Sequence, residues 1–193
     1  MLLLRTEKLP QGPDWLYEIK LDGYRILAIN SEGKVRLRSR NDNDFTPRYA
    51  QIASALHCLP NETVIDGEVV ALDESGRPDF NLLQHSRSAA SRIHHLIFDL
   101  LVHKGRDLTR LPLIGRRELM RSVLKFRSPL VRIADHVEAS ATDMLHAVRE
   151  QHLEGVIGKQ RDSLYEPGKR SGAWIKYRAS AKRICTGVTA SGV

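Results

Sequence analysis

Apolar and polar residues alternate with a period of two along several short segments of the chain, and this pattern predicts β-strands. The predicted strands cover residues 16–21, 25–29, 35–39, 64–72, 95–101, 155–159 and 173–177. Apolar residues at helical spacing predict helices over 45–56, 81–91 and 112–126, and from Ser140 or Thr142 to His152. Strands separated by turns, with helices between them, indicate an α+β fold of antiparallel β-sheets flanked by helices.

Charged residues occupy every second position of the first predicted strand. Its period of two places Glu18, Lys20 and Asp22 on one face, and Tyr17, Ile19 and Leu21 on the face that can enter a core. Burying a lysine between two carboxylates is costly unless the charges meet a ligand, a metal ion or each other. This cost favours a functional site at Lys20, and an edge strand with a solvated face is the structural alternative.

Two later strands carry acidic residues among apolar neighbours. Asp66 and Glu68 share one face of the strand 64–72, and paired buried acids require a cation. In the strand 95–101, Asp99 follows Phe98, whose ring either offers a flat face to a planar base or simply packs in the core. These acids therefore extend the candidate site beyond Lys20.

The last two predicted strands add cations. Glu154 and Lys159 lie at opposite ends of the segment 154–159. Lys176 and Arg178 are two positions apart, so they point to the same side at a spacing suited to successive phosphate oxygens. A phosphate-bearing ligand fits this set of charges.

The charge of the whole chain agrees with such a ligand. Its 193 residues include 30 Lys or Arg and 23 Asp or Glu, a net charge of +7. Residues 155–193 hold eight basic and two acidic residues, which is a local charge of +6. A basic end of this kind suits polyphosphate or a nucleic-acid backbone, although a solvated basic surface gives the same count.

Composition also bounds the class of protein. A hydrophobic content of 41% supports one globular domain with a small appendage. Cys58 and Cys185 match no metal-ligand spacing and no disulfide framework, so we expect ordinary buried or idle thiols in a reducing compartment. No apolar run has the length of a signal peptide or a membrane span, so we expect a cytoplasmic protein without a membrane partner.

In their order and spacing, these segments resemble the nucleotidyltransferase motifs of ATP-dependent DNA ligases. Motif I is Lys20–Arg25, motif Ia Ser39–Asn41, motif III Asp66–Glu68, motif IIIa Phe98–Leu100, motif IV Glu154–Lys159 and motif V Trp174–Arg178. The segments 38–45, 71–81 and 163–169 are most similar to the ligase domain of bacterial double-strand-break end-joining ligases. The resemblance therefore covers nearly the whole chain and places it in the bacterial cytosol or nucleoid.

The resemblance implies a fold and a division of the chain. The fold is the covalent nucleotidyltransferase, ATP-grasp-like ligase adenylation fold with a central ATP cleft. Residues 1–178 are expected to form this adenylation domain. Residues 179–193 are expected to be a linker and the first strand of a missing OB-fold domain. Whether that domain is lost, is a separate polypeptide or belongs to a longer ligase stays open, and an OB-fold domain or an end-joining partner in trans is a candidate partner.

The resemblance also implies a role for each matching residue. Lys20 attacks the α-phosphate of ATP and carries AMP, which passes to a 5′-phosphate in nicked or broken double-stranded DNA. Repulsion from Lys159, Lys176 and Arg25 favours the neutral amine that attack requires. In nucleotide binding, Glu18 contacts the adenine amino group, Phe98 stacks on the base, and Arg25 and Arg40 reach ribose or phosphates. The other residues assigned to nucleotide binding are Ile19, Glu68, Lys159, Lys176 and Arg178. Glu68 and Glu154 hold magnesium or manganese.

Three positions depart from the family pattern, in which motif V usually ends in lysine. This chain has Arg178 there, Asp42 where glycine is common, and Gly158 where a larger residue is common. Two alternatives stay open: an RNA ligase or mRNA-capping type of nucleotidyltransferase, and a non-catalytic, truncated nucleic-acid-binding remnant. Without an OB-fold domain, nick sealing is in doubt.

Overall fold

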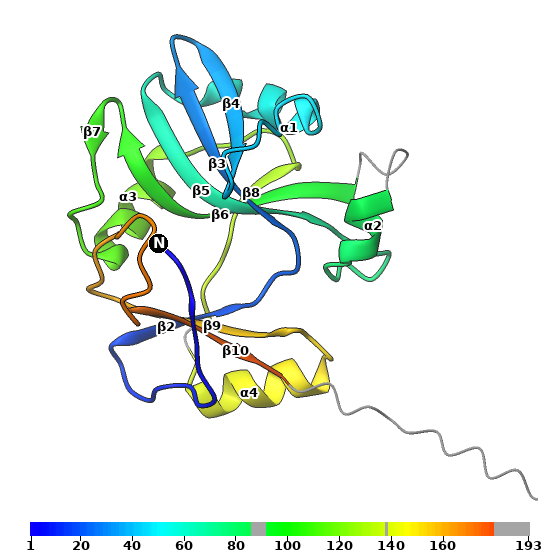
Figure 1. The fold of residues 1–193 in the computed structure, drawn as a ribbon, viewed down its shortest axis with the longest axis vertical. Coiled ribbons are helices and arrows are strands. Elements are labelled where there is room, and N and C mark those ends of the chain that lie inside the picture. Colours follow the sequence, from blue (N-terminus) through cyan, green and yellow to red (C-terminus); the bar gives the residue numbers. More distant parts are fainter. Residues whose placement is uncertain (86–91, 138, 180–193) are drawn as a thin grey trace, which may run out of the picture.

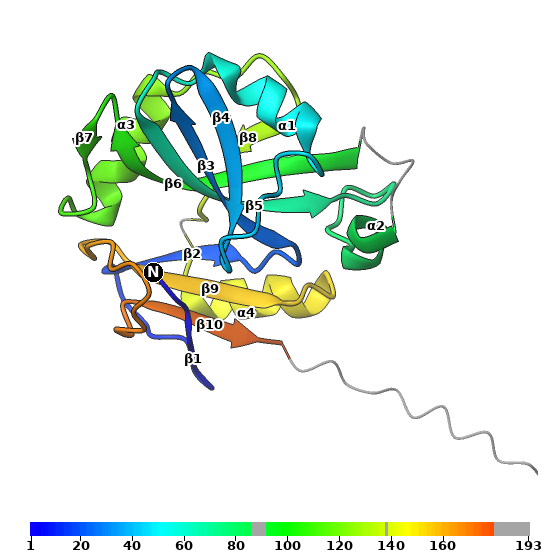
Figure 2. The same ribbon diagram turned by 45° about the horizontal axis from the view of Figure 1, so that its top comes forward.

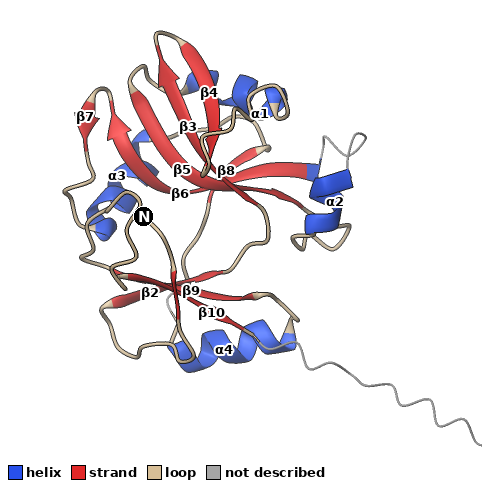
Figure 3. Cartoon of the chain, viewed as in Figure 1, coloured by secondary structure: helices blue, strands red, loops and turns tan. Residues whose placement is uncertain are grey.

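The computed structural model describes residues 1–85, 92–137 and 139–179, and these fold around two β-sheets with few helices (Figures 1 and 3). The four-stranded small sheet has the order β1 (Leu4–Arg5), β10 (Trp174–Arg178), β9 (Gly155–Gln160) and β2 (Trp15–Ile19). The large sheet runs β4 (Lys34–Ser39), β3 (Tyr24–Ser31), β5 (Thr63–Ala71), β6 (Ile93–His103) and β7 (Arg106–Asp107), with β8 (Val131–Ile133) paired to β6. Within the described residues, no helix has the length and apolar character needed to cross a membrane.

Most strand pairs are antiparallel, and β1–β10 and β6–β8 are parallel. The helices are α1 (Ala50–Ala55), α2 (Phe80–His85), α3 (Leu113–Val123) and α4 (Ala141–Glu150), and a 3-10 turn covers Leu56–Cys58. The α+β prediction is confirmed at this level. All predicted strands are present, and the unpredicted strands β1, β7 and β8 have only two or three residues, too few to show alternation.

The helix prediction needs four corrections. The helix predicted over 112–126 covers only Leu113–Val123, and Leu124 after it has an extended backbone. Residues 45–49 are not helical, because the Phe45 N–H donates to Leu37 O and the Leu37 N–H donates to the Thr46 hydroxyl, which ties this segment to β4. The helix predicted over 81–91 begins at Phe80, and residues 86–91 lie outside the described part. The helix α4 ends at Glu150, so His152 is not helical and has a φ of 54°.

Three apolar clusters hold the layers together. One packs the large sheet against α1 and α3, and another packs the small sheet against α4, which covers its outer face (Figure 2). The third lies between the two sheets and includes Leu16, Phe98, Leu113, Tyr165 and Trp174. The sheets therefore face each other across a shared buried layer.

Motif I makes the crossing from one sheet to the other. β2 ends at Ile19 in the small sheet and β3 begins at Tyr24 in the large sheet, so residues 20–23 form the crossing segment. Gly23 runs against β5, where a Cβ atom on it would lie 2.2 Å from Val69 O and 3.0 Å from Glu68 Cγ. Only glycine fits this close approach, which fixes Lys20 near Glu68.

Candidate functional site

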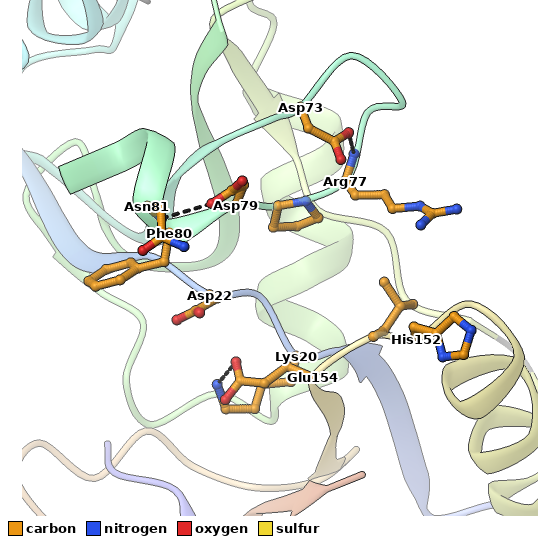
Figure 4. A pocket seen from close by; sticks show the side chains of 11 residues that line it. Lys20, Asp22, Asp73, Arg77, Asp79, Phe80, Asn81, His152 and Glu154 are labelled. Carbon is orange, nitrogen blue, oxygen red and sulfur yellow. Dashed lines mark hydrogen bonds and ion pairs between the residues drawn. The ribbon is translucent and has the colours of Figure 1, made fainter. Parts of the chain in front are cut away.

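Lys20 lies at the mouth of a cavity of about 470 Å³, just after β2 (Figure 4). Its backbone N–H donates to Gly155 O at 2.9 Å, and its ammonium forms an ion pair with Glu154. The side chain of Lys20 is 13% exposed. The cavity is lined by Lys20, Asp22, Asp73, Arg77, Pro78, Asp79, Phe80, Asn81, His152, Leu153 and Glu154.

Glu154 joins Lys20 to the cations of β10. Its Oε2 atom pairs with Lys20, and its Oε1 atom lies 3.6 Å from Arg178 Nε. Burial lowers the pKa of Lys176, and repulsion from Arg178 and Lys20 lowers it further. Lys20, Lys176 and Arg178 thus form one electropositive group around a single carboxylate, which suits phosphate oxygens.

A second group lies between the sheets, at Phe98. Lys159 Nζ is 2.6 Å from Glu18 Oε2 and stands 4.2 Å from the centre of the Phe98 ring and 4.3 Å from that of Trp174. Burial lowers the pKa of Lys159, and the Glu18 carboxylate opposes this shift. An apolar ring, a carboxylate and a buried cation are therefore side by side.

The paired acids of β5 have different partners. Arg25 donates to Asp66 twice, from Nε at 3.0 Å and from Nη2 at 2.6 Å, and the Tyr165 hydroxyl donates to Asp66 Oδ2 at 2.9 Å. Asp66 therefore has the cation that the sequence predicted for the paired acids. The guanidinium of Arg25 also lies 5.5 Å from the Phe98 ring centre, which connects β5 to the second group.

Glu68 is the carboxylate that still needs a cation. Burial raises its pKa to about 8, a shift that the charges of Arg25 and Lys20 oppose, and in the described part of the chain no side chain donates a hydrogen bond to it. A divalent ion would restore the charged form. The described residues contain no cluster of three or more metal-ligating side chains. The assignment of Glu68 and Glu154 as ligands of magnesium, an ion that keeps several waters and shares oxygens with substrate phosphates, stays a prediction.

Comparison with known proteins identifies the family. A family model described as ATP dependent DNA ligase domain matches residues 5–178, which include every motif from Lys20 to Arg178. The chain belongs to this ligase domain family. The predicted resemblance to the ligase domain of bacterial end-joining ligases is confirmed as well, by the following relatives.

The chain is 38% identical over 183 residues to the multifunctional non-homologous end joining protein LigD of Pseudomonas aeruginosa, and the match covers 92% of this chain and 21% of that protein. It is 36% identical to the LigD protein of Mycolicibacterium smegmatis, over 86% of this chain and 22% of that protein. A solved structure, mycobacterial DNA ligase D complexed with ATP and MES, is 33% identical with a TM-score of 0.76, covering 91% of this chain and 59% of that one. The chain spans about a fifth of the length of these curated relatives.

The structure gathers most of the predicted site residues of this ligase domain. Lys20, Glu18, Arg25, Glu68, Phe98, Glu154, Lys159, Lys176 and Arg178 belong to the connected groups described above. Lys159 and Arg25, expected as free cations around Lys20, pair with Glu18 and Asp66 instead. Arg40 is exposed in the turn after β4, and within the described residues it joins no hydrogen bond or ion pair of the site.

The face assignment of β2 is confirmed for Tyr17, which is 2% exposed, and needs a correction at Ile19. Ile19, expected to enter the core, is 37% exposed, whereas Glu18 on the charged face is only 5% exposed. The reason is that β2 lies at the edge of the small sheet and ends at Ile19, while its charged face points into the layer between the sheets. Of the two expected alternatives, a buried or an idle thiol, Cys58 is not the buried one, since it is a free and exposed thiol, and Cys185 lies outside the described residues.

Sequence reasoning missed two arginines of the ligase domain. Arg116 and Arg117 of α3 are both fully buried, and Arg116 holds Asp99 by two hydrogen bonds of 2.8 Å. The sequence contains a signal that these two arginines are buried. Together with Leu113 and Met120 they occupy the i, i+3, i+4 and i+7 positions of the helix, which form the stripe that normally faces a core. Two cations on such a stripe require buried carboxylates nearby.

Proposed function

We propose that this chain is the adenylation domain of an ATP-dependent DNA ligase, in which Lys20 forms a covalent bond with AMP. Lys20 Nζ attacks the α-phosphate of ATP, an N–P bond forms, and the bond to the pyrophosphate oxygen breaks. The ammonium must first release its proton, and the paired Glu154 carboxylate is placed to accept it. The observation that carries the proposal is that Lys20 pairs with Glu154 at a cavity that both residues line, and that the same carboxylate lies 3.6 Å from Arg178.

Nucleotide binding follows from the same groups. We assign the adenine ring to Phe98, its amino group to Glu18, and the ribose or phosphates to Arg25, Arg40, Lys159, Lys176 and Arg178, with Ile19 beside the nucleotide. Lys159 stands 4.2 Å from the centre of the Phe98 ring, so a stacked base displaces this ammonium from the ring face. Mycobacterial DNA ligase D, to which this chain is 33% identical, was solved in complex with ATP, which supports this nucleotide for the chain.

Glu68 and Glu154 are proposed to hold magnesium or manganese. When bound, the ion offsets negative charge on the phosphates. Residues of the chain orient the nucleotide and exclude water. Lys176 and Arg178 orient phosphate oxygens, and the apolar layer around Phe98 excludes water from the base.

The later steps are proposals about a larger assembly. AMP passes from Lys20 to the 5′-phosphate of a DNA break, and a 3′-hydroxyl then displaces it. We propose that residues 1–178 form the adenylation domain of an ATP-grasp-like fold with its ATP cleft between the sheets. Residues 179–193 lead toward an OB-fold domain, in the same polypeptide or in trans, and residues 180–193 lie outside the described part.

One experiment tests the proposed function. The chain is incubated with α-labelled ATP and magnesium, and acid-labile label on the protein is followed on a denaturing gel. Label that resists competition by GTP supports an adenylating ligase, and label that GTP removes supports a capping type of enzyme. Transfer of the label to nicked DNA rather than to RNA ends separates a DNA ligase from an RNA ligase. A protein that takes no label supports the alternative of a non-catalytic nucleic-acid-binding module.

A further inference from the structure

Arg117 connects the two sheets at the proposed base site, although it lies outside every ligase motif. It is fully buried in α3, so it has no surface to offer a nucleotide. Its Nη1 atom donates to Glu18 Oε1 at 2.5 Å and to Phe98 O at 3.1 Å, and Nη2 donates to Ala134 O at 2.8 Å. One guanidinium therefore fixes β2 at Glu18 and β6 at Phe98.

Glu18 is held on both of its oxygens. Arg117 contacts Oε1, and Lys159 Nζ lies 2.6 Å from Oε2 while standing over the Phe98 ring. A carboxylate paired with two cations accepts hydrogen bonds and donates none. Because Arg117 Nη1 donates to both Glu18 Oε1 and Phe98 O, the acceptor lies beside the residue on which a base would stack, and this link does not depend on the Lys159 ammonium that the base displaces.

We propose that Arg117 is a positioning residue that selects the nucleotide base through Glu18. It holds the carboxylate beside the Phe98 ring, so the site takes a purine with a 6-amino donor and rejects one with a 6-oxo acceptor. This inference rests on the proposed function, since it concerns the base of the nucleotide that loads Lys20. A buried acceptor that meets no donor, or meets another acceptor, loses the stabilisation of a charge-assisted hydrogen bond.

Arg116 provides a matched control. It is the neighbouring residue of α3, it is also fully buried, and it makes a two-bond pair with Asp99 instead of Glu18. Replacing either arginine removes one buried guanidinium from the same helix. A difference between the two variants therefore reports the contact with Glu18 rather than the loss of a buried charge.

The experiment measures self-adenylylation of the whole chain with ATP, with purine riboside 5′-triphosphate, which lacks the 6-amino group, and with inosine 5′-triphosphate. For the unmodified protein we expect ATP to react faster than purine riboside triphosphate by about 10- to 100-fold, the value of one hydrogen bond to a charged group. In Arg117→Met, which removes the donor to Glu18, the ratio of the ATP rate to the purine riboside triphosphate rate falls to within about threefold of one. In Arg117→Lys, which keeps a cation, this ratio is intermediate. In Arg116→Lys both rates fall together and the ratio stays at the starting value.

Two results overturn the inference. One is a ratio of the ATP rate to the purine riboside triphosphate rate near one in the unmodified protein, which shows that no group recognises the 6-amino position. This result does not depend on whether any variant folds. The other is an unchanged ratio in Arg117→Lys or Arg117→Met. Both differ from failure of the proposed function, in which the unmodified protein takes no label from ATP at all.

Discussion

Lys20 and Glu154, which are 134 positions apart in the chain, form an ion pair where the small sheet meets the crossing segment. The pair joins motif I to motif IV. It places the proposed nucleophile beside a carboxylate that also approaches Arg178. In the nucleotide-free protein the amine is thus held as a paired cation, and a proton must leave before it can attack phosphorus.

Replacing Glu154 by Gln tests this pair. The amide keeps the size of the side chain but removes the charge and the proton acceptor, so we expect self-adenylylation to slow by about 100-fold or more. Because the pair is partly exposed, stability should change by less than about 1 kcal/mol. Glu166→Gln, which disrupts a peripheral pair with Lys169, serves as the control and should leave the rate unchanged. An unaltered rate in Glu154→Gln would remove Glu154 from the mechanism.

Gly23→Ala tests the close approach of motif I to β5. The added methyl group meets Val69 O at 2.2 Å, a backbone atom that cannot turn away, so we expect a loss of about 1–3 kcal/mol in unfolding free energy and a slower reaction of Lys20. Gly115→Ala in α3 meets nothing within 4 Å and should stabilise the helix by about 0.5–1 kcal/mol. Urea unfolding of both variants measures the contrast, and equal effects would contradict it.

Asp99→Asn tests the buried pair that anchors motif IIIa. Asp99 and Arg116 are both 0% exposed, so the amide leaves a guanidinium charge without compensation and should cost about 3–5 kcal/mol. At the surface, Glu74→Gln breaks a pair with Arg92 whose side chains are 85% and 45% exposed, and should cost less than about 1 kcal/mol. Chemical denaturation gives both values. A cost below about 1 kcal/mol for Asp99→Asn would show that the pair adds little.

His95 predicts a pH dependence of stability. Burial lowers its pKa from 6.5 to about 4, so the unfolded chain binds a proton below pH 6.5 that the folded chain binds only near pH 4. Stability is therefore complete above pH 6.5 and falls by about 3 kcal/mol as the pH drops to 4. His95→Leu should remove this part of the slope, and His146→Gln, at an exposed position of α4, should keep it. Identical slopes in the unmodified protein and His95→Leu would contradict the prediction.

Local patterns were sufficient for much of the fold. Alternation identified strands such as β3 and β4, in which buried positions alternate with more exposed ones, whereas β1 and β7 have two residues each and give no pattern. The end of α4 was misplaced, because His152 turns with a positive φ that the apolar spacing does not reveal. The assignment of strands to two sheets depends on contacts between distant segments, which no local pattern contains.

Only part of the site could be predicted, because its contacts also join segments that are distant in the sequence. The pairing of Asp66 with a cation followed from the cost of buried acids, and Arg25 supplies it. The neighbours of Lys20 came from the resemblance to ligases rather than from spacing. Arg117 was missed because it lies outside the ligase motifs, although its place on the apolar stripe of α3 pointed to a buried carboxylate such as Glu18.

The most direct test of the account is to locate AMP on the protein. The chain is incubated with ATP and magnesium, and its peptides are analysed by mass spectrometry under conditions that preserve a phosphoramidate. We predict the mass of one AMP on the peptide that contains Lys20, and none in Lys20→Ala. An unmodified Lys20, or AMP on a different residue, would contradict the central claim that Lys20 is the nucleophile.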